Sequence, residues 1–348
     1  MKRSVLILSI AASILFAHAA SAKQSVTFAV FAENGEQLRH ARILIESLQT
    51  FGGGFKGAPV RVFVPTTVIK AERKLLEDLA SRGAVVEASD APGDSRSFGF
   101  AGKVFAAARA EARAEAVDKA SILVWMDEDT VILKEPGAFA LPAGISLGYR
   151  PVMHQNIGSL YSAAPDAFWS RIYKVLSVPE RAVFPMKTVA DGKALRPYFN
   201  AGLLVVRPER RILRTWAESF TTLYRDPVLG DLCDKDKSRR LFLHQAALAG
   251  AVLNLLGKQE MVQLSDLYNY PLFFKETRGA AREFDTINDV VTLRYESFFR
   301  NPPRGWEKKL KGPPAAVSWL KERFGKEPDR GEDAATKMRF KFERGGVG

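Results

Sequence analysis

The sequence predicts an α/β protein with a mixed, mostly parallel sheet covered by helices on both faces. Two observations carry this prediction. Short apolar segments alternate with longer amphipathic segments along the chain, and alternation at this spacing is typical of strand–helix–strand units. The apolar segments are also continuously hydrophobic, as expected for strands that are buried on both faces of a sheet.

The predicted elements follow one another in a regular order. Strands are expected at residues 26–31, 59–64, 85–87 and 121–126, and helices at residues 37–48, 67–82 and 103–119. The second strand ends at Pro65, and the last of these helices is dominated by Ala, Arg and Glu, which include strong helix formers. Further along, residues 203–206 predict a strand and residues 241–253 a helix.

Composition places the chain among globular proteins. Its 348 residues are 47% hydrophobic and 26% charged, which fits one large domain or two small ones. The formal net charge of +12 favours anionic partners such as nucleotides, phosphorylated polymers or membrane surfaces, although a basic solvated surface is the simpler interpretation. No nucleic-acid-binding motif is present, so nucleic acid is not expected as a partner. The single cysteine, Cys233, excludes an intrachain disulfide.

The N-terminus has the pattern of an export signal. Lys2 and Arg3 precede an apolar stretch at residues 5–17, and residues 20–22 read Ala-Ser-Ala, a typical cleavage pattern. We therefore predict a signal peptide at residues 1–22 and an exported protein, periplasmic or secreted. The alternative is an N-terminal membrane anchor, because residues 4–22 could nearly cross a bilayer core of about 30 Å. No later segment is apolar enough to span, which leaves peripheral membrane contact as the other option.

Three consecutive acids lie between two apolar segments. Asp127, Glu128 and Asp129 follow the predicted strand at residues 121–126, at the carboxyl end where open α/β sheets bind ligands. In an extended chain, residues two apart point the same way and lie roughly 6 to 7 Å apart. Asp127 and Asp129 can therefore face one site together and suit Mg²⁺ or Mn²⁺, which prefer oxygen ligands. The alternative is that the acids cap a turn.

Two further segments carry polar residues next to predicted elements. Asn200 and Gly202 precede the strand at residues 203–206, where a glycine lets a ligand approach the backbone and an amide can donate and accept hydrogen bonds. The helix at residues 241–253 presents His244 and Gln245 near its predicted start. A histidine on a helix can equally be a structural residue.

Together these residues resemble a known family. An apolar strand entering D-x-D at residues 127–129, F-N-A-G at residues 199–202 and His-Gln at residues 244–245 occur in the order found in nucleotide-diphospho-sugar transferases of the GT-A fold. The chain is especially similar to family 8 glycosyltransferases, from about Val26 to about Tyr295. The resemblance implies a GT-A-like domain at residues 23–300, followed by a peripheral basic segment at residues 301–348.

The resemblance also implies a function for the acidic pair and its neighbours. The protein would transfer a sugar from a nucleotide-diphosphate donor to a glycan, lipid or protein acceptor. Asp127 and Asp129 would hold Mn²⁺ or Mg²⁺ on the donor diphosphate, and Asp127 would also contact the ribose. Lys103 would add positive charge at the nucleotide, and Gly202 would lie against it. The alternative for Lys103 is a solvated helix lysine.

Three residues would serve the transfer itself. The resemblance implies that Asn200 and Gln245 contact donor sugar hydroxyls or the reacting face. His244 would be the base that accepts the acceptor's proton if the reaction inverts.

One segment departs from the family pattern. Family 8 members supply a further metal ligand, a histidine, in a late strand that precedes a K-P-W element, but this chain reads VVTLRYESFFRNPPRGW there. Arg294 or Arg300 occupies that neighbourhood. An arginine cannot ligate a metal, but it can neutralise a diphosphate.

Two other functions compete with sugar transfer. An exported, non-catalytic carbohydrate- or surface-binding protein on the same scaffold would explain the missing histidine and the export signal. A nucleotidyltransferase would also use paired acids on a parallel sheet. It is disfavoured because the segment after the first strand, FAENGEQLRH, contains only Gly35 and therefore no glycine-rich phosphate loop.

Overall fold

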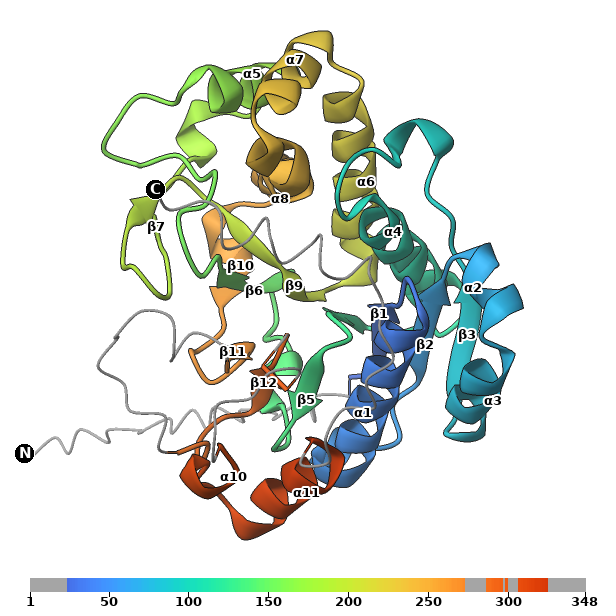
Figure 1. Ribbon diagram of the computed structural model, residues 1–348. Coiled ribbons are helices and arrows are strands. Elements are labelled where there is room, and N and C mark those ends of the chain that lie inside the picture. Colours follow the sequence, from blue (N-terminus) through green and yellow to red (C-terminus); the bar gives the residue numbers. More distant parts are fainter. Residues whose placement is uncertain (1–23, 273–285, 297, 300–305, 325–348) are drawn as a thin grey trace, which may run out of the picture.

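The structure is a computed structural model that describes residues 24–272, 286–296, 298–299 and 306–324. At its centre is a seven-stranded sheet in the order β10-β6-β9-β4-β1-β2-β3 (Figure 1). These strands are β1 (Val26–Phe31), β2 (Val60–Val64), β3 (Ala84–Ala88), β4 (Ile122–Met126), β6 (Leu147–Pro151), β9 (Phe199–Val206) and β10 (Met261–Gln263). β9 is antiparallel to β4 and β6, and the other neighbours are parallel. The predicted mixed, mostly parallel sheet is confirmed.

Helices cover both faces of this sheet. One face packs against α1 (Gly35–Phe51) and α3 (Arg73–Ser81). The other packs against α4 (Ala101–Ala116), α5 (Ala167–Val175), α6 (Ile212–Tyr224), α7 (Pro227–Lys235) and α8 (Lys237–Leu255). Within β4, Leu123 and Trp125 enter the second cluster while Val124 enters the first. Successive side chains of a strand point to opposite faces, so a strand covered on both sides is mostly apolar. The exception in β2 is the buried Arg61, which is ion-paired with Glu87 and Asp118.

The helix predicted at residues 67–82 is two helices, so that prediction is wrong in one respect. α2 (Thr66–Ala71) ends at Glu72, whose backbone leaves the helical region with φ −114° and ψ 39°, and α3 begins directly afterwards. The apolar periodicity continues across the break. The interruption of the helix at Glu72 could not be predicted, because it affects one residue and the spacing of apolar residues does not change there.

The helix that carries His244 and Gln245 also begins earlier than predicted. α8 starts at Lys237 because Asp236 caps it, with Oδ1 accepting from the backbone N–H of Ser238 at 2.9 Å and of Arg239 at 3.3 Å. His244 and Gln245 therefore lie inside the helix and not at its start.

A smaller sheet lies beside the main one, in the order β11-β12-β5 (Figure 1). It consists of β5 (Thr130–Ile132), β11 (Tyr270–Pro271) and β12 (Thr292–Arg294), and it packs with α10 (Trp306–Lys309) and α11 (Pro314–Phe324). The shared cluster includes Val131, Leu293, Tyr295, Trp306, Trp319 and Leu320. The predicted division of the chain at residue 300 stays a prediction, although α11 and β12 share this apolar cluster.

The remaining elements are short. β7 (Met186–Lys187) and β8 (Ala194–Leu195) form a hairpin. Single 3₁₀ turns occur at Gly53–Phe55, Gly93–Ser95, Gly137–Phe139, Glu180–Ala182, Pro208–Arg210 and Lys258–Glu260.

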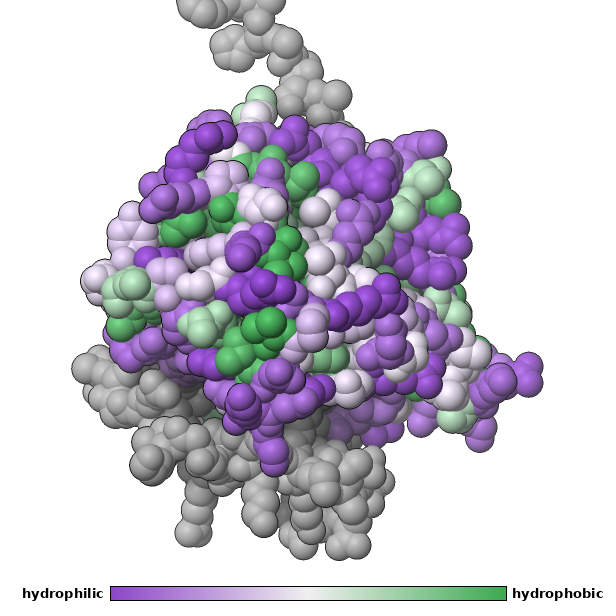
Figure 2. All heavy atoms as spheres, turned by 90° about the horizontal axis from the view of Figure 1, so that it is seen from above, coloured by the Kyte–Doolittle hydropathy of each residue, from purple (hydrophilic) through white to green (hydrophobic). Residues whose placement is uncertain are grey.

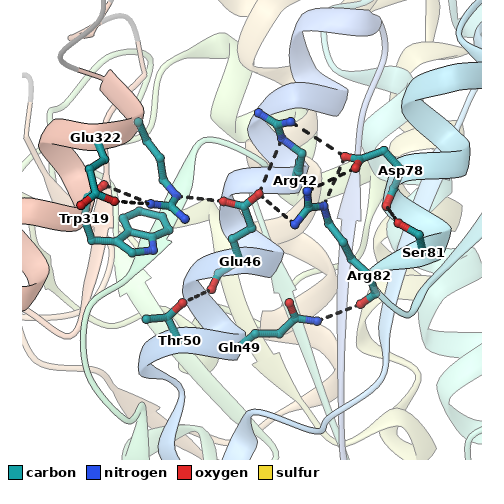
Figure 3. Close-up of polar contacts among 10 residues, drawn as sticks. Arg42, Glu46, Gln49, Thr50, Asp78, Ser81, Arg82, Trp319 and Glu322 are labelled. Carbon is teal, nitrogen blue, oxygen red and sulfur yellow. Dashed lines mark hydrogen bonds and ion pairs between the residues drawn. The ribbon is translucent and has the colours of Figure 1, made fainter.

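Glu46 of α1 is the centre of an ion-pair network that joins three helices (Figure 3). Its carboxylate lies 3.0 Å from Arg82, which follows α3, and 2.8 Å from Arg323 of α11. The Arg323 guanidinium lies 3.9 Å from the centre of the Trp319 ring, and that ring meets Phe51 of α1 edge to face at 5.8 Å. Polar and aromatic contacts together therefore hold α11 against α1.

A second buried carboxylate fixes α6 on α4. Glu111 of α4 accepts hydrogen bonds from the backbone N–H groups of Leu213 at 3.0 Å and Arg214 at 2.9 Å, and from Arg214 Nε at 3.0 Å. Burial raises the pKa of Glu111, and these hydrogen bonds and the Arg214 charge oppose the rise. Because α6 packs against α8, this contact also sets α8 relative to α4.

The surface seen in Figure 2 is mostly polar, with apolar residues divided among small patches. Within the part of the chain that the structure describes, no helix combines the length and apolar character that crossing a membrane requires. The predicted signal peptide at residues 1–22 and the alternative arginine, Arg300, lie outside the described residues.

Candidate active site

The acidic segment meets the F-N-A-G segment at one edge of the sheet. Met126 pairs with Leu203 in the antiparallel ladder of β4 and β9, which places Asp127 opposite Gly202. The Asp127 N–H donates to the Gly202 carbonyl at 2.9 Å. Because β9 runs against β4, its first residues lie at the carboxyl end of β4, where α/β sheets bind ligands.

Gly202 is closely surrounded. A Cβ at this position would lie 2.5 Å from Asp127 Oδ2, 2.9 Å from Asn200 Oδ1 and 3.1 Å from Arg294 Nη1. The Gly202 N–H also donates to Asn200 Oδ1 at 2.8 Å. The sequence predicts a ligand beside this glycine. In the structure, the side chains of Asp127, Asn200 and Arg294 occupy that space.

Lys103 reaches the acidic segment from the first turn of α4, where its Nζ forms an ion pair with Asp127 Oδ1. Burial alone would raise the pKa of Asp127, but the charges of Lys103 and Arg294 outweigh burial and lower it. Glu128 shifts the other way, because burial and then the charges of Asp129 and Asp127 raise its pKa well above its ordinary value. Glu128 is therefore more easily protonated than Asp127, whose side chain is held as a carboxylate.

Arg294 lies between the two aspartates. Its Nη2 is 3.0 Å from Asp127 Oδ2 and its Nε is 3.3 Å from Asp129 Oδ1, while Nη2 also lies 3.1 Å from Glu296 Oε1. Burial would lower the pKa of Arg294, but these carboxylates raise it well above its ordinary value, so the guanidinium is charged. The expected position of Arg294 beside the acidic pair is confirmed.

α8 contributes His244, whose side chain is almost completely buried. Its ring lies 4.6 Å from the ring of Phe100 and 6.4 Å from that of Trp216, centre to centre. Nδ1 lies 3.0 Å from the Leu241 carbonyl oxygen. A carbonyl only accepts hydrogen bonds, so we assign a proton to Nδ1; in the neutral tautomer this leaves the lone pair on Nε2.

Two buried amides have unpaired atoms. Gln245 Oε1 has no hydrogen-bond partner among the described residues, and neither do Oδ1 and Nδ2 of Asn269, a residue that is 1% exposed. Native proteins rarely leave such atoms unpaired, and where they do, an unplaced water, an ion or a function is the usual explanation. Gln245 was predicted from the sequence as a site residue, and its unpaired oxygen is consistent with a ligand contact.

Sequence reasoning missed Phe100. This residue precedes α4 with φ 62°, a left-handed conformation that a bulky residue rarely adopts, and its ring contacts His244. Strained residues of this kind cluster at functional sites. The left-handed backbone of Phe100 could not be recognised from its residue type, because a bulky aromatic residue is not expected in that conformation.

The acidic pair does not form a complete metal centre in the structure. Across residues 24–272 and the described segments after them, no group of three or more His, Cys, Asp or Glu side chains is arranged to hold an ion. The group nearest to both aspartates is instead the guanidinium of Arg294, which has only hydrogen-bond donors.

The carboxyl end of β4 thus brings together an acidic pair, a lysine and a glycine on a mixed α/β sheet. The sequence profile of the Rhodobacterales glycosyltransferase domain matches residues 28–255, and the chain therefore belongs to that family. The predicted membership of a glycosyltransferase family is confirmed. A comparison with curated proteins found no match.

Solved glycosyltransferase structures are similar to this chain at low identity. Mouse xyloside xylosyltransferase 1, in its apo form, is 14% identical over 78% of this chain and 97% of that one, with a TM-score of 0.43. The galactosyltransferase LgtC, in complex with donor and acceptor sugar analogs, is 14% identical over 90% and 99%, with a TM-score of 0.46. The glycosyltransferase GlyE of Streptococcus pneumoniae is 15% identical over 88% and 65%, with a TM-score of 0.40.

Proposed function

We propose that this protein transfers a sugar from a nucleotide-diphosphate donor to a hydroxyl of a glycan, lipid or protein acceptor. The observation that supports the proposal best is the convergence of Lys103, Asp127 and Gly202 at the carboxyl end of β4, in a chain of a glycosyltransferase family. The formal charge of +12 also favours an anionic donor.

The proposed reaction exchanges one bond for another at the anomeric carbon. The bond to the diphosphate oxygen breaks and its electron pair stays on the diphosphate, while the acceptor oxygen forms the new bond and loses its proton. Lys103 and Arg294 would stabilise the charge that develops on the leaving diphosphate. In an inverting reaction the proton would pass to His244, whose Nε2 we assign as the basic nitrogen.

The other two predicted residues would hold the donor sugar. Gln245 Oε1 is buried and has no partner among the described residues, so we propose that it accepts a hydrogen bond from a sugar hydroxyl. Asn200 Oδ1 already accepts from the Gly202 N–H at 2.8 Å. A sugar contact of Asn200 would use its amide nitrogen as donor or the second lone pair of Oδ1 as acceptor.

The metal ion expected from the sequence does not fit the residues as they are arranged. Mg²⁺ and Mn²⁺ need carboxylate oxygens that face the ion. Asp127 and Asp129 instead face Arg294 at 3.0 and 3.3 Å, and the described residues supply no third ligand beside them. The proposed reaction therefore contains no step through a metal.

A second candidate function is an exported carbohydrate- or surface-binding protein without transfer activity. The ion pairs of Arg294 favour this second function, because Asp127 and Asp129 are already neutralised by the guanidinium and are less available to bind a metal ion on a donor. Nucleotide binding separates the two functions, because only the transferase needs a nucleotide donor.

We expect UDP or GDP to bind the purified chain, and Lys103→Gln to weaken that binding roughly tenfold because one charge-assisted contact is lost. Isothermal titration calorimetry measures both affinities. Lys174→Gln is the matched control, because Lys174 is exposed on α5 and far along the chain from the site. If neither nucleotide binds the wild-type chain, the transferase proposal fails, and glycan binding in the same experiment would support the second candidate.

We also propose that the protein is exported to the periplasm or secreted, and that any contact with a membrane is peripheral. Expression in a bacterial host should yield a mature protein that begins at Lys23, since Ala20 and Ala22 are the small residues that signal peptidase requires. Mass spectrometry of the N-terminus checks this, and Ala22→Arg should block cleavage. A wild-type protein that keeps residues 1–22 would instead be anchored.

A further inference from the structure

We infer that Arg294 is the resident cation of the donor site, and that the nucleotide binds to this chain without a divalent metal ion. The inference rests on the proposed function, because its ligand is the donor diphosphate. Lys103 and Arg294, two fixed side chains, would provide the positive charge that an ion provides in a metal-dependent site.

The first support is the occupancy of the aspartate oxygens. Asp127 Oδ1 pairs with Lys103 Nζ, Asp127 Oδ2 with Arg294 Nη2 at 3.0 Å, and Asp129 Oδ1 with Arg294 Nε at 3.3 Å. Three of the four carboxylate oxygens that would face an ion are thus already held by cationic side chains. An ion could use them only after Arg294 or Lys103 had moved away.

The second support is that the backbone of Arg294 is pinned on both sides. Arg294 pairs with Thr130 in the ladder of β12 and β5, and the Tyr295 N–H donates to the Asp129 carbonyl at 3.1 Å. On the other side, the Leu272 N–H donates to the Arg294 carbonyl at 2.9 Å. The backbone contacts therefore fix the Cα of Arg294 next to the acidic pair.

The third support is the balance of charge. Lys103 pairs with Asp127, whereas Arg294 contacts Asp127, Asp129 and the partly exposed Glu296. Moving the guanidinium away would therefore leave the buried carboxylate of Asp129 without this cation, which is strongly unfavourable. A guanidinium has five N–H donors, more than these contacts use, so it can bind a diphosphate while it stays in place.

The test measures the affinity of the full chain for Mn²⁺ by calorimetry, in the absence of nucleotide. Arg294→His places an imidazole beside Asp127 and Asp129 and so completes a set of three metal ligands. We expect this variant to bind Mn²⁺ at least about tenfold more tightly than the wild-type chain, the scale on which single groups at metal sites act. The added substitution Asp129→Asn should remove the gain.

Arg171→His is the matched control, because Arg171 is also ion-paired and partly buried but contacts the single carboxylate of Asp226, so an imidazole there does not complete a set of three ligands. It should bind Mn²⁺ no better than the wild-type chain. A wild-type chain that binds Mn²⁺ as tightly as Arg294→His would overturn the inference.

A second measurement does not depend on the folding of any variant. The affinity of the wild-type chain for UDP and GDP should be the same in EDTA and in Mn²⁺, and a tenfold increase with Mn²⁺ would contradict the resident role of Arg294. If no nucleotide binds under either condition, the proposed function fails and the nucleotide part of the inference fails with it, while the Mn²⁺ titration still decides whether Arg294 keeps a metal ion from the acidic pair.

Discussion

Gly202→Val should reduce the affinity for UDP or GDP roughly 100-fold, the scale of effect expected when a functional group is displaced by about 1 Å. A Cβ at Gly202 would lie 2.5 Å from Asp127 Oδ2 and 3.1 Å from Arg294 Nη1, so both charged groups must move. Overpacking of this kind costs about 1 to 3 kcal/mol, which a folded domain tolerates. Calorimetry measures the affinity, and thermal unfolding checks that the variant is folded.

Gly230→Val is the matched control for this experiment. No atom lies within 4 Å of a Cβ built at Gly230 of α7, so a side chain there meets open space. Its nucleotide affinity should equal that of the wild-type chain. Wild-type affinity in Gly202→Val would show that the contact between Gly202 and Asp127 does not shape the nucleotide site.

Trp319→Ala should lower the free energy of unfolding by about 3 to 5 kcal/mol, the usual cost of removing a buried tryptophan. The ring packs edge to face on Phe51 at 5.8 Å and lies under the Arg323 guanidinium at 3.9 Å. Its loss would weaken the cluster in which α11 packs with Leu293 and Tyr295, the neighbours of Arg294. Guanidinium chloride denaturation measures the change.

Two milder substitutions test whether the loss of stability comes from removing the aromatic ring. Trp319→Phe keeps an aromatic ring and removes an indole N–H that has no partner among the described residues, so it should cost far less than Trp319→Ala. Ser318→Ala, at an exposed position of the same helix, should leave stability unchanged. A Trp319→Ala protein as stable as the wild type would mean that α11 does not support the β12 region.

Much of the fold could be predicted from local patterns. β4 is apolar on both faces, β1 and β2 are apolar apart from Thr27 and Arg61, and α4 is rich in helix-forming residues, so each is visible in a short window of sequence. The break at Glu72 and the start of α8 at Lys237 were missed. Both depend on single backbone conformations or caps, which periodicity does not reveal.

The site was predicted in outline. Asp127 and Gly202 could be placed at one edge because each adjoins a predicted strand, and the register of β4 and β9 then brings them opposite one another. Phe100 could not be found, because nothing in the neighbouring residues indicates its left-handed backbone or its ring contact with His244, which is 144 positions away in the chain. The roles assigned to His244, Gln245 and Asn200 stay predictions.

The sequence by itself determined that three acids follow a buried strand and that a glycine adjoins the apolar part of another, because such features depend only on neighbouring residues. The second strand is longer than predicted, since β9 begins at Phe199 and so contains Asn200 and Gly202. Only the tertiary structure decided which cation meets the acids. Arg294 is 165 positions from Asp129 in the chain, and the two meet because β12 pairs with β5. Long-range strand pairing depends on the packing of the whole domain, so no local pattern could show that an arginine lies between Asp127 and Asp129.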